Sequence, residues 1–209
     1  VSMTGTGQSI FNATSFFGSA GRLHSMLNMN RLSVYPDDLN CLADPTCRVA
    51  MGCAGVDADF LRRLYEFGCG PFFDVMSVHP YQWGGQFNDG WMIDKLESCR
   101  KLMDEYGDHH KEMWLTELGW SLSEGVTAEQ QANLLAQAMV TALTARERLK
   151  VEKVFWFCVK DWGGPGHGLF DVDGKPKPSF VAYRVLIGAL EGARYVGPWK
   201  VSEKVRAHL

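Results

Sequence analysis

Apolar residues between positions 47 and 191 alternate between short continuous runs, which predict strands, and longer stretches with helical spacing. The expected strands are residues 47–54, 72–79, 111–118 and 154–159. The expected helices are residues 57–67 and 91–106, a third that begins at Thr127 and carries an apolar stripe from Leu134 to Leu143, and a last one from Pro178 to near Gly192. The stretch Thr127-Ala-Glu-Gln130 has the pattern of a capping box and marks the start of the third helix. The last strand, VFWFCV, is apolar on both faces, as in a parallel strand covered by helices.

The last helix begins at Pro178, and its spacing places a stripe of apolar residues inward: Phe180, Tyr183, Leu186, Ile187 and Leu190. Four strand-then-helix units in succession indicate an α/β fold with a parallel sheet or a segment of a barrel. Residues 1–46 contain no Lys and no Glu and are rich in Ser, Asn and Gly, so we expect an irregular leader there. Residues 47–195 form the expected domain and residues 196–209 a C-terminal tail.

The composition of the chain argues against several classes of partner and site. The 209-residue chain is 46% hydrophobic and has a formal net charge of −3, so it lacks the basic footprint of a nucleic-acid partner. No apolar run approaches the roughly 20 residues of a membrane span, and the start of the chain shows no signal peptide. Cys41 and Cys47 are placed for a local disulfide or remain free, which leaves the localisation open between secreted and cytoplasmic. No cysteine makes a C-x-x-C pair and the cysteine spacing does not resemble a zinc site, so no metal site is expected. We expect no cofactor.

Chemistry-bearing residues follow the ends of three expected strands, where active sites of parallel α/β proteins form. The second strand runs into SVHPYQW, the third into TELGW and the fourth into KDW, followed by the glycine-rich GGPGHG. Side-chain alternation puts His79 and Tyr81 on one face with Ser77 beneath them, and Glu117 on the face of Met113 and Leu115. The glycine-rich loop lacks the Lys and following helix of a phosphate-binding loop.

One carboxylate among indoles and a phenol suits sugar rings, whose C–H faces stack on aromatic side chains. Other interpretations remain open. Glu117 would also serve as a structural ion-pair partner, His79 before a proline would cap a turn, and Trp114 or Trp156 would fill the core. A metal hydrolase that uses His79 with the pair at positions 109–110 is a further reading.

Three motifs, in order, resemble the C-terminal half of clan A glycoside hydrolases, nearest to the family 39-like and family 5-like cellulase or β-glycosidase group. They are FDVMSVHPYQWG, WLTELGWS and VFWFCVKDW with GLFDVDGKPKPSFVAYRVL. The resemblance implies strands 5–8 of a (β/α)₈ barrel and retaining hydrolysis of β-glycosidic bonds in oligo- or polysaccharides. It also implies that Glu117 is the nucleophile, oriented by Tyr81. The expected substrate-binding residues are His79, Tyr81, Trp83, Trp120, Trp156, Asp161 and Trp162.

The chain departs from this family in two respects. The family's acid/base Glu follows an Asn on the fourth barrel strand, whereas no Asn-Glu pair precedes Cys47 and the first Glu is Glu66. The matching region also has no counterpart of the first four strands. We therefore expect a partial barrel that is completed by association into a homo-oligomer. Its second carboxyl would be Asp161, Asp89, Glu124 or a carboxylate of another chain; the alternative is an impaired barrel fragment that binds carbohydrate or has no activity.

Overall fold

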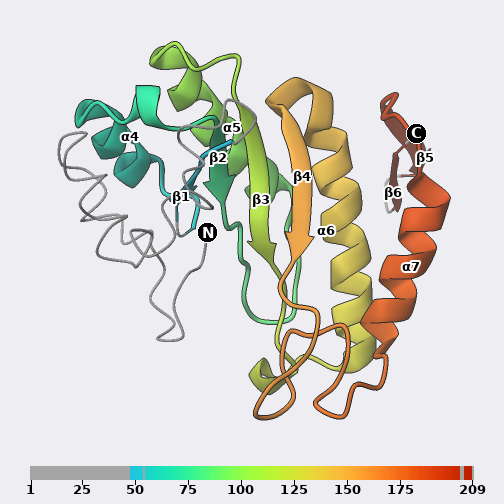
Figure 1. Ribbon diagram of the computed structural model, residues 1–209. Helices are drawn as coiled ribbons and strands as arrows, with labels where there is room; N and C mark the ends of the chain where they lie inside the picture. Colours follow the sequence, from blue (N-terminus) through green and yellow to red (C-terminus); the bar gives the residue numbers. More distant parts are fainter. Residues whose placement is uncertain (1–47, 54, 203–204, 209) are drawn as a thin grey trace.

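The computed structural model describes residues 48–53, 55–202 and 205–208. The expected leader and the Cys41–Cys47 pair lie outside these residues. Within the described part, a parallel sheet has the order β1-β2-β3-β4 (Figure 1). Its strands are β1 (Ala50–Cys53), β2 (Val75–Val78), β3 (Glu112–Leu118) and β4 (Val151–Trp156). The predicted α/β fold with four parallel strand units is confirmed.

A helix follows each strand along the chain: α4 (Ala58–Glu66), α5 (Asp89–Glu105), α6 (Ala128–Leu149) and α7 (Pro178–Leu190). The capping box predicted at Thr127 is present, because its side chain accepts from Gln130 N–H and the Gln130 side chain accepts from Thr127 N–H. Short 3₁₀ helices η2 (Gly70–Phe72) and η3 (Leu122–Glu124) lie in the loops. An antiparallel pair, β5 (Pro198–Ser202) and β6 (Val205–His208), occupies most of the expected tail.

The core lies between the sheet and helices α4, α5 and α6. Met113 and Leu115 of β3 pack there with Leu96 of α5 and Leu61 of α4, all fully buried. Burying one such side chain contributes about 1.5–3 kcal/mol of transfer free energy. A second cluster joins the ends of β3 and β4 to the first half of α6, and it contains Leu118, Trp120, Leu135, Trp156 and Leu169. This second cluster supports the loops that follow β3 and β4.

Strand β4 differs from the expected strand that is apolar and covered on both faces. It begins at Val151, and its exposed residues are Glu152, Lys153 and Phe155, the last 45% exposed. Lys153 and Phe155 lie beside Trp114 of β3, on the face of the sheet opposite Met113 and Leu115, which pack against the helices. On the helical face, α7 packs mainly on α6, so Glu152 stays exposed. Within the described residues β4 is also an edge strand, paired only with β3.

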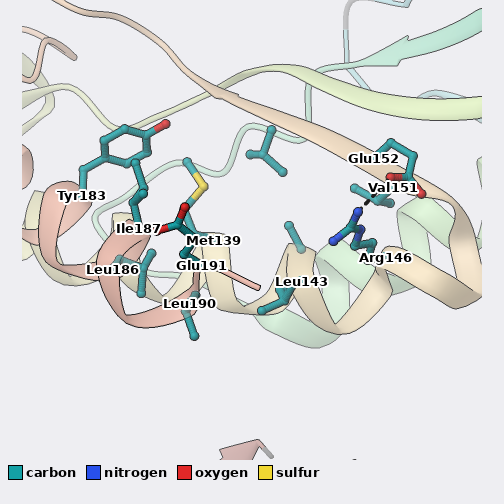
Figure 2. Close-up of a pocket in the computed structure, with 12 residues that line it drawn as sticks. Met139, Leu143, Arg146, Val151, Glu152, Tyr183, Leu186, Ile187, Leu190 and Glu191 are labelled. Atoms are coloured by element: carbon teal, nitrogen blue, oxygen red, sulfur yellow. Dashed lines mark hydrogen bonds and ion pairs between the residues drawn. The ribbon is translucent and has the colours of Figure 1, made fainter. Parts of the chain in front are cut away.

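The same packing leaves a groove of about 400 Å³ between α6, α7 and β4. Figure 2 shows its apolar side chains and, at one end, the ion pair between Arg146 and Glu152. Ile187, which the helical spacing placed inward, is 51% exposed and lines this groove. That part of the prediction is wrong, because α7 has a neighbouring helix on one side and no strand directly beneath it.

Candidate functional site

The carboxyl ends of β2, β3 and β4 meet at one edge of the sheet, toward which the arrowheads of β3 and β4 point in Figure 1. His79 and Tyr81 follow β2, Glu117 lies near the end of β3, and the loop after β4 carries the remaining candidates. Parallel pairing brings these segments together, since consecutive parallel strands end on the same side.

Glu117 is held by two side chains from the loop after β2. Its Oε2 accepts a 3.1 Å hydrogen bond from the Tyr81 phenol and lies 3.6 Å from His79 Nδ1. Burial and the Glu117 charge both raise the pKa of Tyr81, so the phenol stays protonated and donates. Burial lowers the pKa of His79, and the Glu117 charge opposes this only partly, so the imidazole is neutral at pH 7.

Glu117 reaches this position because the end of β3 is irregular. Pairing with β4 passes from Leu115–Val154 to Leu118–Trp156, so three residues of β3 span two of β4. This extra residue breaks the alternation. Glu117 therefore does not lie with buried Leu115 and Met113, as alternation predicted, but faces Tyr81.

Thr116 anchors the neighbouring part of the site. Its Oγ1 lies 2.9 Å from His79 Nε2 and is hydrogen-bonded to Ser77 Oγ. The predicted grouping of His79 above Ser77 is thus present, with the Thr116 hydroxyl as their common partner. His79 is oriented on both ring nitrogens, by Thr116 on one and by the Glu117 carboxylate on the other.

Two of the expected sugar-binding tryptophans are buried. Trp120 has no exposed surface and packs against Phe87 and Trp156; its Nε1 has no partner among the described residues. Trp156 is 9% exposed and donates through Nε1 to the carbonyl of His167 at 2.8 Å. The core-filling interpretation that was open for Trp156 matches this packing.

Asp161 is also buried, at 5% exposure, and is engaged by protein groups. One oxygen lies 3.0 Å from Lys177 Nζ and the other accepts a 2.6 Å bond from Gly168 N–H. Burial raises the pKa of the Asp161 carboxyl, but the hydrogen bonds from Lys177, Gly168 and Gly166 outweigh it and lower the pKa below its ordinary value. The carboxylate stays ionised and fixes the loop, which makes it unsuited to donate a proton.

Exposed aromatic rings lie in contact with the partner of Glu117, Tyr81, directly or through other rings. Trp83 is 68% exposed and stacks on Tyr81 at 6.0 Å, and Trp162, 69% exposed, meets Phe157 edge-to-face at 5.8 Å. The ring of His167 connects the two pairs, 6.2 Å from Tyr81 and 5.5 Å from Phe157. A row of five rings, Trp83, Tyr81, His167, Phe157 and Trp162, therefore passes the candidate nucleophile.

Sequence reasoning missed Phe157 and His167. Phe157 directly follows β4. It could have been found from its position next to Trp156, because the end of a predicted strand is uncertain by about one residue. His167 lies in GGPGHG, which the sequence analysis tested only as a phosphate loop. Nothing local marks this histidine, because its neighbours in the row come from the ends of β2 and β4.

The metal-hydrolase reading has no geometric support. His109 and His110 lie just before β3, at the amino end of the sheet, whereas His79 follows the carboxyl end of β2. In the part of the chain that the structure describes, no three His, Cys, Asp or Glu side chains are grouped to hold a metal ion. Likewise, none of the described helices is long and apolar enough to cross a membrane.

Known structures share this fold over part of their length. The chain is similar to a glucosidase from Croceicoccus marinus, with a TM-score of 0.57 and 18% identity, covering 86% of this chain and 38% of that one. It is also similar to xylanase 10B from Thermotoga maritima, with a TM-score of 0.50 and 16% identity, covering 83% and 54%. A GH128 endo-β-1,3-glucanase from Amycolatopsis mediterranei matches with a TM-score of 0.49 and 22% identity, covering 76% and 64%. The chain thus spans less than two thirds of each of these proteins.

No curated protein matches the chain. A sequence family described as the glycosyl hydrolase catalytic core matches residues 42–183, which include all four strands of the parallel sheet, Glu117 and the row of rings. The structural likenesses agree with the fold of a partial (β/α)₈ barrel. The chain belongs to the glycosyl hydrolase catalytic core family.

Proposed function

We propose that this protein hydrolyses β-glycosidic bonds with retention of configuration, as a β-glucosidase or endoglucanase does, and that Glu117 is the nucleophile. The observation that carries the proposal is the hydrogen bond from Tyr81 to Glu117 at the carboxyl edge of the sheet. Exposed Trp83 and Trp162, at the two ends of the row of rings that includes Tyr81, supply surfaces on which sugar rings stack. The xylanase, glucanase and glucosidase likenesses are consistent with a carbohydrate substrate.

In the proposed first step, a carboxylate oxygen of Glu117 attacks the anomeric carbon. The new C–O bond forms as the glycosidic C–O bond breaks, and the departing oxygen takes a proton. Because Tyr81 occupies Oε2, Oε1 is the attacking atom. Water then hydrolyses the glycosyl ester and returns Glu117 to its carboxylate form, which gives a product of the original configuration.

The described residues offer no clear proton donor for the departing oxygen. A retaining site places its second carboxyl about 5–5.5 Å from the nucleophile. Asp161 is ionised and tied to Lys177, which leaves Asp89, Glu124 or a carboxylate of another chain. We therefore expect the greatest activity on substrates whose leaving group needs no protonation, such as dinitrophenyl glycosides.

The engagement of Asp161 also favours a second candidate function, carbohydrate binding without cleavage. The exposed rings of Trp83 and Trp162 would bind a sugar whether or not a proton donor is present. The two functions differ in turnover, so one set of variants separates them.

The test compares the parent with Glu117→Gln on dinitrophenyl β-glucoside, dinitrophenyl β-xyloside and a soluble β-glucan, with Glu152→Gln as matched control. Glu152 lies at the distant groove. We expect Glu117→Gln to lower kcat by about 10³-fold or more while the control keeps the parent rate. Equal rates for the parent and Glu117→Gln would remove Glu117 from the mechanism. Sugar binding without turnover by the parent would establish the second function.

Two further measurements identify the role of Glu117. In a Glu117→Gly variant, azide should enter the space left by the carboxylate and form an α-glycosyl azide, with dinitrophenolate leaving. The parent should release the β-anomer first, as followed by proton NMR. A β-glycosyl azide would instead assign Glu117 as the acid/base residue.

A further inference from the structure

His167 is a polar side chain at the centre of the ring row that the proposed mechanism does not use. Its imidazole lies edge-on to Tyr81 and Phe157 and is partly buried. Among the described residues, neither ring nitrogen has a hydrogen-bond partner, although the main chain on both sides is heavily bonded. A partly buried polar ring without protein partners, next to the residue that orients the nucleophile, is available to a ligand.

The main chain around His167 is fixed by four side chains that are each less than a tenth exposed: Gln131, Trp156, Asp161 and Lys177. Together they bind three consecutive residues. The carbonyl of Gly166 accepts from Gln131 Nε2 and from Lys177 Nζ, both at 3.1 Å.

The next two residues are bound in the same way. The carbonyl of His167 accepts from Trp156 Nε1 at 2.8 Å, and Gly168 N–H donates to Asp161. Each of these contacts costs desolvation of a buried polar side chain, and all of them act on the backbone of a single short segment. The result is an imidazole held in one place, unlike the side chain of a mobile glycine-rich loop.

Two glycines permit this arrangement. A Cβ on Gly168 would lie 2.4 Å from Asp161 N and 2.6 Å from the carbonyl oxygen of Phe170. A Cβ on Gly119, after β3, would lie 2.6 Å from the carbonyl oxygen of Phe157 and 3.3 Å from Cδ2 of His167. The close approach of the segments after β3 and β4 therefore brings the imidazole to the site.

We propose that His167 is a substrate-binding residue, which exchanges hydrogen bonds with a hydroxyl group of the sugar held over Glu117. A neutral imidazole carries one N–H donor and one acceptor nitrogen, and a sugar hydroxyl can both donate and accept. Burial lowers the pKa of His167, which keeps the ring neutral at pH 7. The inference rests on the proposed function only in placing the sugar at Glu117.

The rival explanation is that His167 only fills space between Tyr81 and Phe157. Two substitutions separate these roles. His167→Phe keeps an aromatic ring of similar shape and removes both nitrogens, whereas His167→Gln loses the ring and restores a donor and an acceptor. Binding is measured by calorimetry in the Glu117→Gln background, which prevents turnover, with cellotetraose, xylotetraose and laminaritetraose as probes.

We expect His167→Phe to weaken binding of the preferred tetrasaccharide about tenfold, and His167→Gln to recover most of that loss. On ¹⁵N-histidine-labelled protein, that sugar should also shift the ring nitrogens of His167, a measurement that needs no substitution there. Tyr183→Phe, on α7, should bind like the parent. If none of the three sugars binds, or if His167→Phe binds equally well and the ring nitrogens do not shift, the proposal is wrong.

The outcomes also distinguish this inference from the proposed function. Weakened binding in His167→Phe together with unchanged turnover in Glu117→Gln would contradict the nucleophile assignment and leave His167 as a sugar ligand. Loss of turnover in Glu117→Gln with no effect at His167 would support the nucleophile and overturn the present inference. A His167→Phe variant that fails to fold leaves the decision to His167→Gln and to the NMR measurement on the parent.

Discussion

The phenolic oxygen of Tyr81 lies 3.1 Å from Oε2 of Glu117, a hydrogen bond that links the loop after β2 to the irregular end of β3. Burial and the neighbouring carboxylate raise the pKa of the phenol, which fixes the direction of the bond from Tyr81 to Glu117. Because His79 contacts the same oxygen, the carboxylate is oriented before any substrate arrives. Such preorganisation lowers the cost of reaching the transition state.

Tyr81→Phe removes this bond and leaves the ring in the row. A hydrogen bond to a charged group contributes about 1.5–3 kcal/mol, so we expect kcat on dinitrophenyl glycosides to fall about 10-fold to 100-fold. Tyr183→Phe on α7 makes the same chemical change away from the site and should leave kcat unaltered. A Tyr81→Phe enzyme with the parent kcat would show that the bond does not contribute to turnover.

The buried pair of Asp161 and Lys177 should contribute strongly to stability. Asp161→Asn leaves the ammonium group of Lys177 without its counter-charge, and breaking a buried pair in this way costs about 3–5 kcal/mol. Urea unfolding monitored by tryptophan fluorescence measures the loss. The exposed pair of Arg146 and Glu152 provides the comparison, and Glu152→Gln should cost less than about 1 kcal/mol. Similar losses in both variants would contradict the structural role assigned to Asp161.

Gly168 should not tolerate a side chain. In Gly168→Ala the new Cβ would meet Asp161 N and the Phe170 carbonyl, both backbone atoms, so we expect a marked fall in melting temperature. Gly188 lies within α7 with no atom within 4 Å of an added Cβ. Gly188→Ala should therefore stabilise the protein by about 0.5–1 kcal/mol through helix propensity. Calorimetric melting curves of the two variants should move in opposite directions.

Stability should fall as the pH drops through about 6.5, the ordinary histidine value. Burial lowers the pKa of both His79 and His167 in the folded protein, so below that pH the unfolded chain binds more protons than the folded chain. The free energy of unfolding therefore decreases toward acid pH. A His79→Gln, His167→Gln double variant should show a shallower decrease between pH 7 and 5.5 in urea titrations. A parent whose stability rises over that interval would contradict this assignment.

Self-association remains a prediction. Within the described residues, β1 and β4 each pair with a strand on one side only, and Phe155 on β4 is exposed. Open strand edges and apolar surface favour pairing with another chain. We expect sedimentation velocity to show a weight-average mass that rises with protein concentration and a smaller rise for Phe155→Lys. One monomeric species at every concentration would exclude the homo-oligomer.

The sequence alone predicted the four strand-then-helix units because hydrophobic spacing and caps are local properties, although it placed the fourth strand three residues too late and missed the β5–β6 pair. The capping box at Thr127 and the four strand-then-helix units needed no knowledge of distant residues. The grouping of His79, Tyr81 and Glu117 was also accessible, since parallel strands end at the same edge. The direction in which the Glu117 side chain points could not be predicted from the sequence, because the extra residue in β3 is defined only by pairing with β4.

For the aromatic residues, too, the sequence predicted where they lie along the chain but not which of them are exposed. The sequence determined that indoles and one glutamate gather at the strand ends, but it did not separate exposed Trp83 and Trp162 from buried Trp120. Only the tertiary structure decided that Asp161 pairs with Lys177 and that His167 stands beside Tyr81. These choices depend on register and on contacts between segments far apart in the chain, and such contacts form only when the sheet and its loops pack together.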